Sequence, residues 1–143
     1  MAFWREKLPL DPTLPATDQG SGSIDDYRGV LQPKNAKVTV RLAASDPCQS
    51  ELKALLGENP EALATATPAR TLQQEGKDEP IEVRLFSGRR VSGIVGRVPC
   101  GLEGVYDEAV RRLDDRGGPA RIPVTIVETK HGLRVDLLIG QTR

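Results

Sequence analysis

The sequence predicts an α+β fold: a small curved antiparallel sheet or partly closed β-barrel with two or three inserted helices. Three observations lead to this class. Several short segments alternate apolar and polar residues with the period of a strand. Glycine-containing turns separate two pairs of these segments, as in β-hairpins. Apolar residues at helical spacing occur between the strand-like segments, so helices interrupt an otherwise antiparallel set.

The most strongly patterned stretch is residues 80–99. Ile81, Val83 and Leu85 alternate with charged residues, which is typical of a strand with one buried face. Gly88 then allows a tight reversal, and residues 91–98 form a second apolar run. We expect a β-hairpin here, with the rest of the domain packed on its apolar side.

The remaining elements are expected in this order. Residues 37–42 alternate as a first strand, and Asp46 and Pro47 are typical of a helix start with Asp46 as N-cap and Gln49 as its capping-box partner. The other expectations are a short helix over 59–65, a strand within 67–74, a helix over 102–115, and two strands over 122–126 and 133–139 joined by a turn at 129–132.

Residues 1–35 differ in composition from the remainder. Prolines and a Gly-Ser run leave no sustained period. We therefore expect a flexible N-terminal tail or linker over 1–35 and one folded domain over 36–143.

Composition limits the classes of function. The chain has 20 basic and 20 acidic residues, so its formal net charge is zero and any nucleic-acid site must be a local patch. Two cysteines are too few for a disulfide scaffold, and no apolar stretch approaches a signal or membrane-spanning length. We expect a cytoplasmic protein with reduced thiols and no membrane partner.

Signatures of catalysis are sparse, so we expect no enzyme activity, no cofactor, no metal and no small-molecule substrate. Phosphate-binding and nucleophile-elbow motifs are absent. The single histidine, His131, falls in an expected surface turn. Cys100, near a helix start, is the one alternative, because a helix N-terminus favours a thiolate; a buried structural cysteine is the favoured interpretation.

One local charge cluster stands out. Arg84, Arg89, Arg90 and Arg97 lie on the expected hairpin, whose strands carry a single acid, Glu82. If Arg84 and Arg97 project from one face, they can contact phosphates. The alternative is an ordinary solvated sheet face on which arginine stems cover apolar surface.

Residues 38–139 resemble a HIRAN-type domain of the free-standing bacterial kind. The resemblance rests on the turn at 45–49, the loop at 76–83, the Val-Gly-Arg-Val-Pro segment at 95–99, Tyr106, and the closing hairpin that ends in RVDLLIG. It implies a small barrel-like fold and a DNA-binding accessory module whose pocket takes a free 3′ end of single-stranded DNA with aromatic rings, an acidic group and backbone amides.

The resemblance also implies site positions. The acidic position corresponds to Glu79, while Pro47-Cys48, Asp78 and Arg97 stand where relatives carry rings. Together with the arginines, this predicts a non-catalytic binding module for single-stranded or end-bearing DNA. Its candidate contacts are Arg84, Arg89, Arg90, Arg97, Lys77 and Glu79. The alternative is a protein-interaction or structural module that keeps the fold but has lost the DNA-end pocket.

Overall fold

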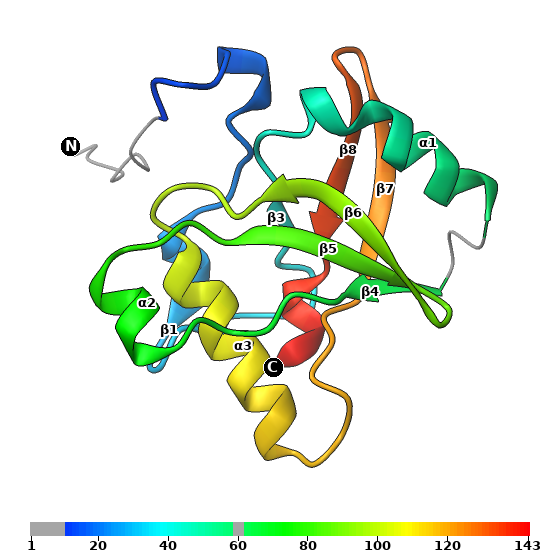
Figure 1. Cartoon of the computed structure of the whole chain (residues 1–143). Coiled ribbons are helices and arrows are strands. Elements are labelled where there is room, and N and C mark those ends of the chain that lie inside the picture. Colours follow the sequence, from blue (N-terminus) through cyan, green and yellow to red (C-terminus); the bar gives the residue numbers. More distant parts are fainter. Residues whose placement is uncertain (1–10, 59–61) are drawn as a thin grey trace.

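The computed structural model describes residues 11–58 and 62–143. It has α+β architecture, as the sequence predicts, with two three-stranded antiparallel sheets and one two-stranded sheet (Figure 1). The strands are β1 (Tyr27–Arg28), β2 (Gln32–Pro33), β3 (Val40–Arg41), β4 (Leu63–Thr65), β5 (Glu82–Ser87), β6 (Arg90–Arg97), β7 (Val124–Thr129) and β8 (Gly132–Leu137). The α-helices are α1 (Gln49–Gly57), α2 (Leu72–Gly76) and α3 (Glu103–Asp115); 3-10 helices are η1 (Ala16–Asp18), η2 (Ile24–Asp26), η3 (Asp46–Cys48) and η5 (Ile139–Thr142).

The two larger sheets meet at both pairs of edges. Their strand orders are β3-β8-β7 and β4-β5-β6. A single bridge joins Ala43, just after β3, to Arg97 of β6, and another joins Ala64 of β4 to Pro123, just before β7. Because the edges touch only at these isolated bridges, the strands form two small curved sheets and no closed barrel.

The hairpin at the centre of Figure 1 is confirmed as β5 and β6. Val83 and Leu85 are fully buried, whereas Glu82 and Arg84 are exposed. The alternation in the sequence therefore corresponds to a strand with one buried face. Gly88 has a φ of +64°, which a residue with a Cβ adopts reluctantly. Two register shifts in the ladder increase the local twist.

One hydrophobic core joins both sheets to α1 and α3. The expected helix after the hairpin is confirmed as α3, and it buries Val105, Tyr106 and Ala109 against the sheets. The Tyr106 hydroxyl donates a hydrogen bond to the carbonyl of Thr67, and burial raises the pKa of Tyr106 to about 12. The closing hairpin is also confirmed, as β7 and β8 with a turn at 129–132.

Two expected elements between α1 and β5 are wrong. The expected short helix over 59–65 is replaced at 63–65 by β4, which pairs with β5; residues 59–61 lie outside the described residues. The expected strand within 67–74 is also not formed. Instead, Thr71 caps α2 through a complete capping box with Gln74.

The start of α1 differs in detail from the expectation. Asp46 belongs to the 3-10 turn η3, and its N-cap is Ser45. The side chain of Gln49 is not a capping partner. Its Nε2 donates to the carbonyls of Ser45 and Leu133, at 2.9 and 3.0 Å, and its Oε1 accepts from the Leu133 N–H at 2.8 Å. Gln49 therefore fastens the helix start to β8.

The expected tail does not hold for residues 11–35. This stretch contains η1, η2, β1 and β2, and it buries Tyr27 and Asp18. The Asp18 carboxylate accepts hydrogen bonds from the backbone N–H groups of Ser45 and Asp46, at 2.9 and 2.8 Å. Contacts to distant side chains and backbone, rather than a local period, order this segment. Residues 1–10 of the expected tail lie outside the described residues.

Candidate nucleic-acid interface

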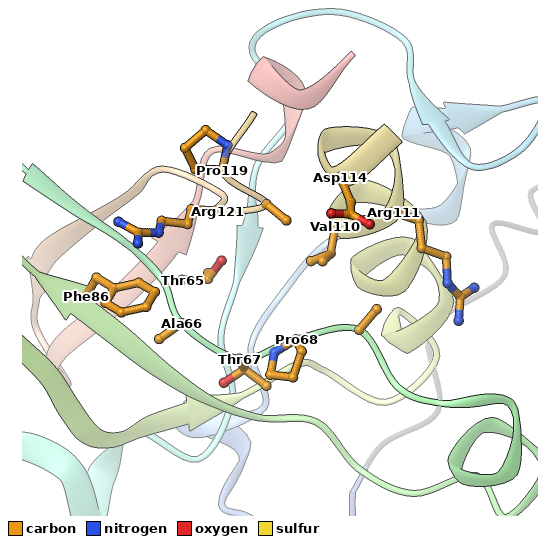
Figure 2. Close-up of a pocket in the computed structure, with 12 residues that line it drawn as sticks. Thr65, Ala66, Thr67, Pro68, Phe86, Val110, Arg111, Asp114, Pro119 and Arg121 are labelled. Carbon is orange, nitrogen blue, oxygen red and sulfur yellow. The ribbon is translucent and has the colours of Figure 1, made fainter. Parts of the chain in front are cut away.

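A groove of about 470 Å³ lies where β5, α3 and the loop before β7 meet (Figure 2). One wall is the segment 65–69, the second is the last turns of α3 with Val110, Arg111 and Asp114, and the third is residues 119–121. Phe86 of β5 closes the end beside residues 65–66. The volume is within the range of small-ligand pockets, about 300–1,000 Å³.

Hydrogen bonds hold the first wall in place. The Thr65 N–H donates to the carbonyl of Ile122, at 2.9 Å, and the Thr65 Oγ1 accepts from the Ile122 N–H at 3.0 Å. The Thr67 hydroxyl donates to the carbonyl of Glu82 and accepts from the N–H of Arg84, both at 2.9 Å. The wall is therefore tied to β5 and to the segment just before β7.

Phe86 and Arg121 form the most distinctive pair in the groove. The centre of the Arg121 guanidinium lies 3.9 Å from the centroid of the Phe86 ring. This is a cation–π contact, and it places a positive charge on an aromatic surface at the groove. The chain has five aromatic residues, of which Tyr27 and Tyr106 are buried and Phe3 and Trp4 lie outside the described residues. Phe86 is half-buried and reaches the surface.

The α3 wall carries charges of both signs. Arg111 is held by ion pairs of 3.1 Å to both Glu75 and Glu108, and the hydrogen bond to Glu75 is the main cause of its raised pKa. Asp114 is exposed and forms no ion pair with any described residue. It stands in the last turn of α3, where the helix dipole disfavours a negative charge.

The structure places Arg84 and Arg97 on one face of the hairpin. Glu82, Arg84 and Phe86 alternate with buried residues along β5, and Arg97 pairs directly with Glu82 across the ladder. The sequence condition that both arginines share a face is met. Arg84 also donates to the carbonyl of Ser92, at 3.4 Å.

The other predicted residues lie elsewhere, so the six do not converge on one groove. Arg89 and Arg90 are at the exposed hairpin turn, and Arg90 forms a 2.8 Å ion pair with Glu58. Lys77 and Glu79 follow α2, where the Glu79 backbone carbonyl accepts from Arg70 at 2.9 Å. The predicted set also omits Arg121, because its partner Phe86 is distant in sequence and no local motif links the two.

Within residues 11–58 and 62–143, no three His, Cys, Asp or Glu side chains gather as metal ligands, and both cysteines are thiols without a disulfide. His131 is exposed in the β7–β8 turn. No helix in this part of the chain is long and apolar enough to cross a membrane.

The surroundings of Cys100 disfavour the thiolate form of its side chain. Burial raises the pKa of its thiol, and the charges of Glu103 and Asp11 raise it further. A raised pKa lowers the thiolate fraction at neutral pH. We therefore expect iodoacetamide to alkylate Cys100 more slowly than free cysteine at pH 7, as measured by mass spectrometry of the tryptic peptide. An apparent pKa for alkylation below about 7.5 would contradict this expectation and restore the nucleophile hypothesis.

Comparison with protein-family models, with curated proteins and with solved structures found no match for this chain.

Proposed function

We propose that the protein is a non-catalytic binding module that contacts single-stranded or end-bearing DNA through the outer face of β5 and β6 and the adjoining groove. The observation that carries the proposal is Phe86, a surface-reaching ring at the groove with a guanidinium on it. Unpaired bases of any sequence can stack on aromatic rings and on arginine guanidinium planes. The resemblance to HIRAN-type domains supports the same ligand class.

Arginines on both sides of Phe86 suit a single DNA strand that runs along β5. Arg121 lies on the ring, and Arg84 is the next outward-facing residue along the strand. Arg97 stands opposite Glu82 on the neighbouring strand. The span from Glu82 to Phe86 along β5 is about 13 Å at ~3.3 Å per residue. Phosphates that contact Arg84 and Arg97 would position the DNA strand while a base stacks on the guanidinium plane that Arg121 holds over Phe86. The neutral net charge of the chain makes this local patch the source of attraction.

Substitution Phe86→Leu tests the proposal. Leucine keeps an apolar side chain against the groove but removes the ring, so packing is retained and stacking is lost. We expect binding of a fluorescein-labelled oligothymidine with a free 3′ end to weaken about 5- to 150-fold, the equivalent of ~1–3 kcal/mol for one stacked base. Fluorescence anisotropy at low salt measures the dissociation constant.

Val30→Ala is the matched control, because Val30 is an apolar side chain that is 74% exposed and does not line the groove. This variant should bind as the wild type does. Equal affinity of the wild type and Phe86→Leu would contradict the proposed contact. Absence of any salt-dependent binding up to about 100 µM protein would contradict the function itself.

A second candidate function is a protein-interaction module. The observation in its favour is that Arg90 and Arg97, two of the four hairpin arginines, are already neutralised by Glu58 and Asp11. A pull-down from native lysate separates the two candidates. Recovery of a protein partner by the wild type but not by Phe86→Leu, without co-purifying nucleic acid, would favour the second.

A further inference from the structure

The loop of residues 11–19 lies on the molecule as a closed unit. The side-chain amide of Gln19 accepts from the N–H of Asp11, at 2.9 Å, and donates to the carbonyls of Asp11 and Leu14, at 2.8 and 3.0 Å. The Leu14 N–H also donates to the Asp11 carbonyl at 3.2 Å. The two ends of the loop are thus joined by one side chain.

The C-terminal end of this loop is firmly anchored. Asp18 is buried and accepts from the N–H groups of Ser45 and Asp46, while its carbonyl accepts from the N–H of Ala44, at 3.0 Å. The guanidinium of Arg134, which is also buried, lies 3.6 Å from the Asp18 carboxylate. Movement of the loop would therefore take place about this anchored end.

Among the described residues, fewer hydrogen bonds and ion pairs hold the N-terminal end of the loop to the rest of the fold. The Asp11 carboxylate pairs with the Arg97 guanidinium, and the Thr13 hydroxyl lies 3.3 Å from the same guanidinium. The Asp11 side chain is 16% exposed and the Arg97 side chain is 26% exposed. Ion pairs that retain contact with solvent contribute little to stability and are screened by salt.

Arg97 itself does not depend on the loop for its position. Its N–H and carbonyl pair with the carbonyl and N–H of Ala43, both at 2.8 Å, at the bridge between the two sheets. The backbone of Arg97 thus belongs to the sheet framework, and only its guanidinium is engaged by the loop. A carboxylate that accepts from an arginine uses the same donors that a phosphate oxygen would use.

We propose that the loop of residues 11–19 is an intramolecular acidic competitor, in which Asp11 holds Arg97 until a phosphate of a bound single strand displaces it. The inference rests on the proposed function and adds regulation of the same site. A DNA strand that reaches from Phe86 to Arg97 must displace the Asp11 carboxylate from the Arg97 guanidinium. The loop therefore weakens DNA binding. Asp18 keeps the loop attached while its other end is released.

The test compares two variants with equal net charge, Asp11→Asn and Asp25→Asn. Asp25 is exposed in η2 and forms no ion pair with a described residue, so its loss changes only the overall charge. With the labelled oligothymidine, Asp11→Asn should bind about 2- to 5-fold more tightly than Asp25→Asn, the equivalent of one partly exposed ion pair. The slope of log affinity against log salt should be nearly equal in the two variants, because Arg97 contacts a phosphate in both complexes.

Two further measurements make the result specific to the loop. In an Arg97→Gln background, Asp11→Asn should give no gain over Asp25→Asn. In the wild type, a saturating oligonucleotide should accelerate hydrogen exchange at the amides of Asp11 and Leu14, which the closed loop protects.

The outcomes separate this inference from the function on which it rests. Binding that depends on Phe86 but is equal in Asp11→Asn and Asp25→Asn would overturn the competitor and leave the function standing. Slower exchange at Leu14 in the complex would also overturn it. Absence of binding in every variant, including Asp11→Asn, would overturn both.

Discussion

Replacing Asp107 with alanine is expected to lower the free energy of unfolding by about 3–5 kcal/mol, because it removes the buried partner of the largely buried Arg70. The ion pair that Arg70 keeps, with the exposed Asp78, is 3.9 Å long. Asp107 lies on α3 with its side chain fully buried. One carboxylate oxygen accepts from the N–H of Arg70 at 2.8 Å, and the other accepts from its Nε at 2.9 Å. The Arg70 side chain is only 10% exposed. Urea unfolding at neutral pH measures the change.

Glu108→Gln is the matched control on the same helix. Glu108 pairs with Arg111 at 3.1 Å, but both side chains are about one-third exposed. A solvated pair of this kind contributes about 0–1 kcal/mol, so this variant should unfold nearly as the wild type does. Equal unfolding midpoints for Asp107→Ala and Glu108→Gln would contradict the assignment of Asp107 as a structural anchor. If the alanine variant does not fold, Asp107→Asn keeps one acceptor for the Arg70 N–H and should show a smaller loss.

The Asp107–Arg70 pair also matters for the groove. Arg70 directly follows the wall formed by residues 65–69, and its other donor binds the Glu79 carbonyl at 2.9 Å. The pair therefore joins α3, the groove wall and the loop before β5. A variant that weakens this pair is expected to loosen the groove before it unfolds the sheets.

Asp18→Ala is expected to have a comparable effect, a loss of about 3–5 kcal/mol in the free energy of unfolding. The substitution leaves the N–H groups of Ser45 and Asp46 without their acceptor, and it removes one acidic neighbour of Arg134, whose side chain is 3% exposed. Arg134 retains a 2.7 Å pair with Asp46, so part of its interaction remains. The shift of the urea midpoint at constant slope measures the loss.

Asp11→Asn supplies the contrast. Asp11 and Asp18 belong to the same loop, but the Asp11 pair with Arg97 remains in contact with solvent. Its loss should change stability by less than about 1 kcal/mol while it changes DNA binding. An unchanged midpoint for Asp18→Ala would mean that the segment is not an integral part of the fold.

Elements with one buried face could be predicted from the sequence. Val83 and Leu85 in β5, and Val135 and Leu137 in β8, are buried as their alternation indicates. In β5 the period of the sequence equals the period of burial, because the strand turns one face to the core. In β8 the buried Arg134 interrupts this alternation. Helix α3 is predictable for the same reason, because its apolar residues recur at helical spacing and lie on one buried face.

The predictions for residues 59–74 are wrong because tertiary contacts overruled local propensity at one segment and a capping signal was overlooked at the next. Leu63 and Ala64 suit a helix, yet β4 forms because its backbone pairs with β5 on one side and reaches Pro123 on the other. The α2 helix was predictable in principle, since Thr71 and Gln74 have capping-box spacing. The ordered state of residues 11–35 had no local signal, because it depends on distant acceptors and donors.

The sequence by itself determined the fold class, both long hairpins, α3, and the fact that Arg84 and Arg97 lie on a hairpin. Only the tertiary structure decided which charges meet. Arg121 contacts the Phe86 ring, and Asp11 pairs with Arg97 at a separation of 86 residues. Such pairs follow from how the two sheets come together at Ala43 and Ala64. No local period of apolar and polar residues predicts them. Burial of one face is a local property that a sequence displays, whereas the partner of a charged side chain depends on the whole packed chain.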